Sequence, residues 1–278
     1  MKRYFSMEKR EEILQELGVA KDKILSDILD YKSQDVVFVA GSLVESLVSN
    51  CCHGMGNRLS DIDIFVLSND SSVDKQVILK DAGHTFYDIE VYDLSIVEHI
   101  VERISQCSFD NVLPANRLVQ LQDNIRLFDY TSLLHRFSYG IPIFNQDRFD
   151  KIRQNFDFNN YLHILRRREI NNFDNPYNDC IGNLEKGNLD VAIYLSRYLI
   201  VSAVKIFLFS QGLSLDRDKW ILLKLKNMDS QKAKDLYHKF GQLYYSALQT
   251  DKDKRINIKD TLKFCNNIVE ETTQKYGF

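Results

Sequence analysis

The stretch from Val36 to Ser68 constrains the fold more than any other part of the chain. It reads VVFVAGSLVESLVSNCCHGMGNRLSDIDIFVLS. A first apolar run ends at Gly41, and a second apolar run contains Asp61 and Asp63. Carboxylates inside an apolar strand are costly to desolvate unless a positive group meets them. The stretch therefore predicts two buried strands and a charged edge with a chemical role.

A third predicted strand, TFYDIEVYDL at 85–94, adds more carboxylates. Side chains alternate between the two faces of a strand, so Asp61 shares a face with Asp63, and Asp88 shares one with Glu90. Neighbouring strands of this kind bring several carboxylates together, and their mutual repulsion favours binding of a cation between them. Carboxylate oxygens suit Mg²⁺, and paired ions stabilise the attacking and leaving oxygens of nucleotidyl transfer.

The pair Gly41-Ser42 predicts an anion site next to these carboxylates. Glycine lets the backbone approach a phosphate closely, because it has no Cβ. Ser42 stands at the N-cap position of a predicted helix, SLVESLVSN, and offers a hydroxyl together with backbone N–H groups. A phosphate cradle and a metal-binding edge are therefore expected side by side.

The pattern GS…SDIDIFVL…YDIEVYDL resembles the nucleotidyltransferase superfamily that includes DNA polymerase beta. The resemblance implies that Gly41 and Ser42 bind the triphosphate of a nucleotide, with ATP the expected co-substrate. It implies that Asp61 and Asp63 bind the metal ions, and that Glu90 supplies the third carboxylate.

Two features of this resemblance stay open. Asp88 is the second choice for the third carboxylate. The gap from Ser42 to Asp61 is 19 positions (61 − 42), longer than the commonest arrangement, and the extra residues are expected in the loop at 50–59.

The chain changes character after about residue 145. Strand and helix patterns alternate before this point, whereas helical periodicity dominates after it. We predict an α/β nucleotidyltransferase domain with a mixed sheet at 1–145 and an all-α helical bundle that binds the acceptor at 146–278.

Asn175 to Leu225 resembles the helical domain of small bacterial nucleotidyltransferases, including aminoglycoside and lincosamide resistance enzymes. In those relatives a carboxylate of the helical domain acts as general base on the acceptor hydroxyl. The candidates here are Asp179, which is preferred as lying near a helix start, and Glu169. An exposed helix acid without a catalytic role is the alternative for either residue.

Several cations are candidates for contacts with the nucleotide phosphates. Arg197 and Lys205 interrupt an apolar helix, where a buried cation needs an anionic partner, either an internal salt bridge or a triphosphate. Lys219 is the first choice for the phosphates. Its neighbour Trp220 is expected to pack in the core, with stacking on the base as the alternative. The run at 166–169, RRRE, is expected to be a solvated helix face, with attraction of an anionic acceptor as the alternative.

The composition of the chain bears on where the protein is expected to be located and on what it is expected to bind. The net charge of −3 disfavours nucleic acid as a partner. The five cysteines have no metal-ligand spacing, and the charged N-terminus lacks an apolar signal segment, so we expect a cytoplasmic protein with reduced thiols. The apolar run from Leu189 to Phe209 contains three charged residues, which favours a core helix over a membrane span.

The sequence therefore predicts a Mg²⁺-dependent nucleotidyltransferase. It would move a nucleoside monophosphate, with AMP from ATP expected, to a hydroxyl of a small molecule such as an aminoglycoside- or lincosamide-like antibiotic. The acceptor, the nucleotide preference and the oligomeric state stay open, with a homodimer as one option. The alternatives are a non-catalytic, antitoxin-like protein of the same fold and an enzyme that nucleotidylates a protein or RNA.

Overall fold

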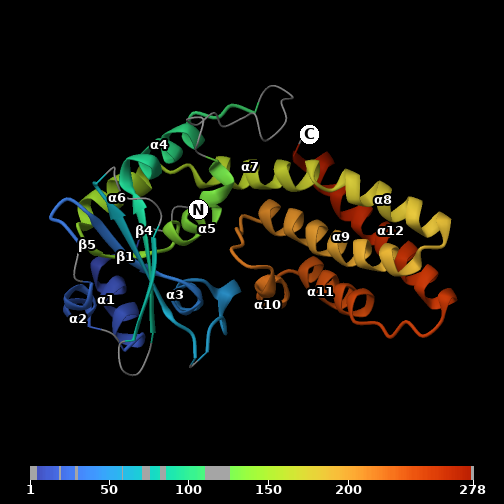
Figure 1. The fold of residues 1–278 in the computed structure, drawn as a ribbon, viewed down its shortest axis with the longest axis horizontal. Coiled ribbons are helices and arrows are strands. Elements are labelled where there is room, and N and C mark those ends of the chain that lie inside the picture. The colour runs from blue at the N-terminus through green and yellow to red at the C-terminus, as the bar shows by residue number, and fades with distance from the viewer. Residues whose placement is uncertain are drawn as a thin grey trace. The chain divides into compact units, whose positions relative to one another are not determined.

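The computed structural model describes residues 5–18, 20–28, 31–57, 59–70, 76–81, 86–109 and 126–276 (Figure 1). The chain divides into two compact units, which are taken one at a time below. The first comprises Met1–Cys107 with Val119–Phe158, and the second comprises Ser108–Leu118 with Asn159–Phe278. The sequence-based boundary between 145 and 146 lies before helix α6, whereas the first unit ends after it.

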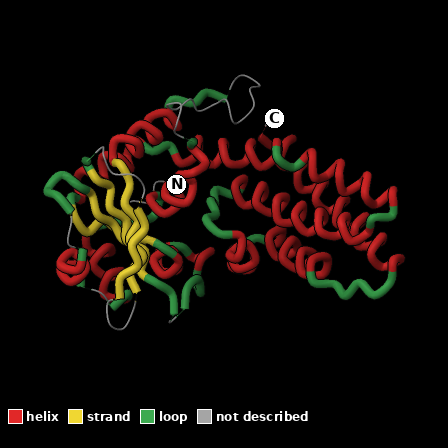
Figure 2. The backbone as a smooth tube through the Cα atoms, viewed as in Figure 1, coloured by secondary structure: helices red, strands yellow, loops and turns green. Residues whose placement is uncertain are grey.

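The first unit is built around a sheet. Its helices and strands are α1 (Met7–Glu16), α2 (Lys21–Asp27), β1 (Val36–Ala40), α3 (Ser42–Val48), β2 (Ile62–Ser68), β3 (Gln76–Asp81), β4 (Phe86–Asp93), α4 (Leu94–Ser105), α5 (Thr131–Phe137), β5 (Ile141–Phe144) and α6 (Gln146–Asn155). The five strands have the order β3-β4-β2-β1-β5. The five strands are drawn in yellow in Figure 2. Among the strand pairs of the described residues, β2 with β4 is parallel and the other three are antiparallel, so the sheet is mixed, as predicted.

The core of this unit lies on the two central strands. All five residues of β1 are buried, because β1 lies between β2 and β5. On one face Phe38 of β1 stacks on Phe65 of β2, with ring centroids 4.9 Å apart. Phe137 of α5 and Phe149 of α6 pack on the ring of Phe38. Aromatic contacts therefore fix α5 and α6 against this face of the sheet.

The sequence did not predict the two edge strands. In β3, Val77, Ile78 and Leu79 are exposed, so the strand lacks the alternation of buried and exposed residues that indicates a β-strand. Strand β5 is only four residues long, and one of them is Pro142, which a sheet tolerates at its edge.

The predicted N-caps of two helices are wrong by one or two residues. Gly41 is the N-cap of α3, and Ser42 is its first helical residue. The sequence SIVEHIVERISQ predicts a helix capped by Ser95, but Asp93 is the N-cap of α4 and accepts a hydrogen bond from the Ser95 N–H at 2.8 Å.

The second unit is helical, as predicted. Its helices are α7 (Phe158–Asn171), α8 (Asp174–Lys186), α9 (Leu189–Ser210), α10 (Ile221–Asn227), α11 (Gln231–Tyr244) and α12 (Asp251–Tyr276). Helix α9 packs against α8, α10, α11 and α12, which makes it the central helix of the unit. It is the one helix in the described part of the chain that is long and apolar enough to cross a membrane, and just over half of its apolar window is buried within the protein.

The expectation of a solvated face at 166–169 is wrong. Arg166 is buried, and its Nη2 lies 3.1 Å from Nδ1 of His163, one turn earlier on α7. The ring of Phe109 stacks on His163, with centroids 3.8 Å apart. The first turns of α7 therefore pack inside the unit despite their charge.

This packing predicts a pH-dependent stability. Burial, with the positive charges of Arg166 and Arg167, lowers the pKa of His163 from 6.5 to about 4. The folded protein keeps His163 neutral while the unfolded chain takes up a proton near pH 6.5, so stability present above pH 6.5 is lost as the pH falls toward 4. We expect His163→Gln to flatten the fall of the urea midpoint over this range.

The matched control for this prediction is His238→Gln, on the exposed face of α11 in the same unit. It should leave the pH dependence of the urea midpoint as in the wild type. Equal slopes for the wild type and His163→Gln between pH 6.5 and 4.5 would contradict the argument.

Candidate active site

The parallel pairing of β2 and β4 places three carboxylates on one face of the sheet. Asp63 lies directly opposite Asp88, and Phe65 lies opposite Glu90. Paired residues of neighbouring strands point to the same side, so Asp63, Asp88 and Glu90 share a face. Asp61 is exposed and directly precedes β2. Asp88 is thus level with Asp63, whereas Glu90 lies two residues further along β4.

Gly41 lies in close contact with this face of the sheet, next to Asp63. Its backbone has φ 92° and ψ −179°, a region that essentially only glycine adopts. A Cβ built on Gly41 would lie 1.7 Å from Oδ2 of Asp63. Both the backbone and the available space therefore require glycine, and the Gly-Ser pair and the Asp-x-Asp strand form a single site.

The loop after α3 folds back toward Ser42. A 3₁₀ turn at Asn50–Cys52 follows α3, and the N–H of Gly54 donates to Oγ of Ser46 at 3.0 Å. A Cβ on Gly56 would lie 2.6 Å from Leu43 and 3.3 Å from the Ser42 hydroxyl. The additional residues of the longer gap thus lie against α3, with residue 58 outside the described part.

The positive group that meets the carboxylates is Arg136 of α5. Its Nη2 lies 3.2 Å from Oδ1 of Asp63, and its Nη1 donates to Oε1 of Glu90 at 3.1 Å. Nη1 also donates to Oγ of Ser132 at 2.8 Å. The Arg136 side chain is only 8% exposed, so this charge is held inside the protein.

Glu90 is held from a second side. The hydroxyl of Tyr92 donates to its Oε2 at 2.5 Å, and Glu90 itself is buried. Burial and the bond to Glu90 both raise the pKa of Tyr92, so this phenol remains a donor. Both carboxylate oxygens of Glu90 therefore have protein donors.

Helix α5 is fixed in place by its own packing. Phe137 is buried among Phe38 and Phe149, as described above. The guanidinium of Arg153 donates to the carbonyls of Ser138 and Gly140, directly after the helix, at 2.7 and 3.1 Å. These contacts determine where Arg136 lies.

The residue before Arg136 links α5 to α3. Nε2 of His135 lies 3.2 Å from Oε2 of Glu45, and the thiol of Cys52 donates to Oε1 of Glu45 at 3.2 Å. All three side chains are buried. His135 and Arg136 thus tie the helix that starts at the Gly-Ser pair to the carboxylate face, and sequence reasoning missed both residues. The signal was the charged pair within SLLHRFSYG.

The two general-base candidates have different surroundings within the helical unit. Asp179 is exposed in the middle of α8, rather than near a helix start as expected, and its main-chain oxygen accepts from Asn183. Glu169 is mostly buried, and Nζ of Lys205 lies 3.6 Å from its carboxylate. Lys205 also lies 3.4 Å from Asp218, so it has the internal salt bridge that was the alternative to a phosphate contact.

The other predicted phosphate ligands have protein contacts of their own. Nη1 of Arg197 donates to Oδ1 of Asn257 at 2.9 Å, and its guanidinium lies over the ring of Tyr244. Lys219 is exposed, and its Nζ lies 4.9 Å from the ring centre of Trp220.

The carboxylate face was tested for its fit to a divalent cation. Within the described ranges, no group of three or more His, Cys, Asp or Glu side chains is arranged to hold a metal ion. Asp63 and Asp88 nevertheless lie side by side and offer the oxygen ligands that Mg²⁺ prefers. The donor chemistry therefore fits, with two carboxylates in register rather than a complete set.

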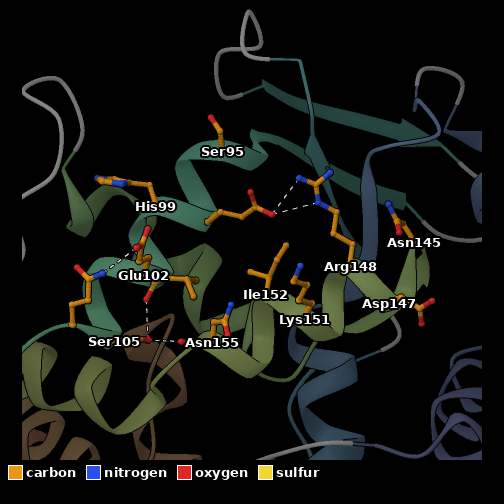
Figure 3. A pocket seen from close by; sticks show the side chains of 13 residues that line it. Ser95, His99, Glu102, Ser105, Asn145, Asp147, Arg148, Lys151, Ile152 and Asn155 are labelled. Atoms are coloured by element: carbon orange, nitrogen blue, oxygen red, sulfur yellow. Dashed lines mark hydrogen bonds and ion pairs between the residues drawn. The ribbon is translucent and has the colours of Figure 1, made fainter.

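A separate hollow of about 1060 Å³ lies between α4 and α6 of the first unit (Figure 3). An ion pair between Glu98 and Arg148, 3.2 Å apart, forms part of its wall. None of the residues that line it is a predicted site residue, and its wall mixes both signs of charge. This hollow indicates no particular class of ligand.

Comparison with known proteins shows a similarity in fold to a solved structure. No family model matches this chain, and no curated protein matches it. Among solved structures it is similar to a nucleotidyltransferase-like protein from Exiguobacterium sibiricum 255-15, with a TM-score of 0.51 and 14% identity over 93% of this chain and 76% of that one. The chain therefore has a nucleotidyltransferase-like fold, a mixed five-stranded sheet with a helical C-terminal region.

Proposed function

We propose that this protein is a cytoplasmic, Mg²⁺-dependent nucleotidyltransferase that moves a nucleoside monophosphate, AMP from ATP as first choice, to a hydroxyl of a small molecule. The observation that carries the proposal is the contact of Gly41 with Asp63, with Asp88 in register on the next strand. A phosphate-binding turn and two metal-type carboxylates thereby share one site. The nucleotidyltransferase-like fold agrees with this chemistry.

The roles of the residues follow from their positions. Gly41 and Ser42 orient the triphosphate through backbone N–H groups and a hydroxyl. Asp63 and Asp88, with Asp61 at the exposed start of the strand, hold Mg²⁺, which neutralises charge that develops on the transferred phosphate. The chain contributes orientation and fixed charge, and pyrophosphate leaves.

We assign the third carboxylate to Asp88 rather than Glu90, the residue that the family resemblance favours. Asp88 is level with Asp63 across the β2–β4 pair. Glu90 gives one carboxylate oxygen to Tyr92 and the other to Arg136. Its function in this proposal is to hold Arg136.

The general base on the acceptor hydroxyl is Asp179 in this proposal, with Glu169 as the alternative. Asp179 is exposed, as a group that meets a substrate must be, whereas Glu169 is engaged by Lys205. We expect Asp179→Asn to slow turnover by roughly 10²–10⁴, the usual effect of a lost general base. Asp174→Asn, an exposed carboxylate on the same helix, is the control. An unchanged rate for Asp179→Asn would move the role to Glu169.

The test of the function is release of pyrophosphate from each nucleoside triphosphate with Mg²⁺. The acceptor panel contains aminoglycosides, lincosamides and other hydroxyl compounds. Release that depends on one acceptor would establish the transferase and its substrate, including a role in antibiotic resistance if that acceptor is an antibiotic. Absence of both release and nucleotide binding would contradict the proposal.

One observation favours a second candidate, a non-catalytic protein that uses this fold to bind a partner. Arg136 forms ion pairs with both Asp63 and Glu90, so a positive group of the chain itself already stands at the carboxylates. A protein of this kind would bind nucleotide equally well with Mg²⁺ and with EDTA, or would not bind it at all. A nucleotide affinity that rises with Mg²⁺ would exclude this candidate.

A further inference from the structure

We propose that Arg136 is an internal counter-ion that competes with a divalent cation for Asp63. Binding of the metal ion is then coupled to release of Asp63 from Arg136, while Glu90 keeps Arg136 in the site. This inference rests on the proposed function only in assuming a divalent-cation site at Asp63, and the experiment below separates the two.

The competition follows from the charges on this face. Asp63, Asp88 and Glu90 share it, and Arg136 donates to two of the three. A divalent cation bound to Asp63 would lie within a few ångströms of the guanidinium. Two positive groups so close repel strongly where water is largely excluded, and both side chains of the Asp63–Arg136 pair are mostly buried. One of them therefore has to leave Asp63.

The contacts of Arg136 determine which bond is given up. Nη1 is held by Glu90 and Ser132, and Glu90 is fixed in turn by the Tyr92 hydroxyl. Nη2 reaches Asp63 at 3.2 Å, on the side of the face where Asp88 lies. Loss of the Asp63 contact leaves the Nη1 contacts in place. The planar guanidinium of Arg136 is therefore expected to turn about its Nη1 contacts, which carries Nη2 away from Asp63, when a cation binds.

The ion pairs of Arg136 also offset the mutual repulsion of the carboxylates on this face. Like charges on one face destabilise the fold unless a cation is present. Arg136 provides this cation from within the chain, so the protein does not depend on metal for its stability.

The experiment measures binding of Mn²⁺ to the full chain by titration calorimetry, without nucleotide, together with the thermal unfolding midpoint in EDTA and in Mn²⁺. We expect Arg136→Met to bind Mn²⁺ at least about tenfold more tightly than the wild type, because the competing charge is gone. Its midpoint should be low in EDTA and should rise in Mn²⁺ by more than that of the wild type. Asp63→Asn should abolish the binding, which assigns the ion to this site.

The matched control is Arg10→Met, which also breaks a mostly buried arginine–carboxylate pair, with Asp150 at 2.7 Å, in the same unit. It should lower the midpoint in EDTA, and the rise of its midpoint in Mn²⁺ should be no larger than that of the wild type. Glu90→Gln provides a second test if Arg136→Met does not fold. Of the two carboxylates that pair with Arg136, Asp63 is then the one left. Because Arg136 and Mn²⁺ compete for Asp63, the affinity of this variant for Mn²⁺ should fall.

The outcomes distinguish the inference from the proposed function. Equal Mn²⁺ affinity of the wild type and Arg136→Met, with binding lost in Asp63→Asn, would overturn the competition and leave the metal site intact. No Mn²⁺ binding by either protein would overturn both the competition and the metal site of the proposed function.

Discussion

Replacing Gly41 by alanine is expected to destabilise the protein and to abolish nucleotide-dependent activity together. The backbone conformation of Gly41 costs a non-glycine residue about 1–3 kcal/mol. The new Cβ would also overlap Oδ2 of Asp63, and Asp63 can move away only by leaving Arg136. Overpacking of this kind adds about 1–3 kcal/mol. Urea unfolding measures the stability, and ATP binding with Mg²⁺ measures the site.

Gly18 provides the control for this prediction. It also has a positive φ, but a Cβ there would meet nothing within 4 Å. Gly18→Ala should therefore cost only the backbone strain and should leave ATP binding unchanged. In the double variant Gly41→Ala/Asp63→Ala the overlap with the carboxylate is removed and a tight contact with the Cβ of residue 63, at 3.0 Å, is left, so the stability cost of the alanine at 41 should shrink. A cost at 41 no larger than that at 18 would contradict the close contact with Asp63.

The second large effect is expected for Asp63→Asn, which should reduce pyrophosphate release by about 10³ or more. A metal ligand contributes several kcal/mol to stabilisation of charge in the transition state. Asp61→Asn and Asp88→Asn should act in the same direction. Because Glu90 still pairs with Arg136 in this variant and Asn is close to Asp in size, the fold should survive the change, as measured by circular dichroism and the unfolding midpoint.

Asp150→Asn is the matched control, since Asp150 is also bound to a mostly buried arginine of the same unit, Arg10. It should lower stability but leave pyrophosphate release as in the wild type. Equal activity of Asp63→Asn and Asp150→Asn would show that Asp63 is not a metal ligand.

The sequence predicted most of the architecture because the decisive signals are local. The apolar runs of β1 and β2, the alternation in β4, and the helical periodicity after residue 145 all lie within short windows. The edge strand β3 was not predicted, because its consecutive apolar residues are exposed and do not alternate with polar ones.

The site was less predictable, because it depends on registers and on contacts between distant segments. The sequence shows carboxylates on two strands, but only the pairing of β2 with β4 brings Asp88, and not Glu90, level with Asp63. The partner of these carboxylates lies far along the chain, on α5, and its position follows from the packing of Phe137 and the bonds of Arg153. Neither is encoded in a local pattern.

Helix α5 has a consequence for how this chain tolerates changes in length. Consecutive helical residues are separated by about 100° around the axis, and here His135 reaches Glu45 while Arg136 reaches Asp63 and Glu90. One residue inserted or deleted before this pair within Thr131–Phe137 would turn both side chains away from their partners at once. A single substitution in this short helix removes the contacts of one side chain, and a second substitution can compensate for it. Insertion or deletion of one residue breaks the contact of His135 with Glu45 and those of Arg136 with Asp63 and Glu90 together.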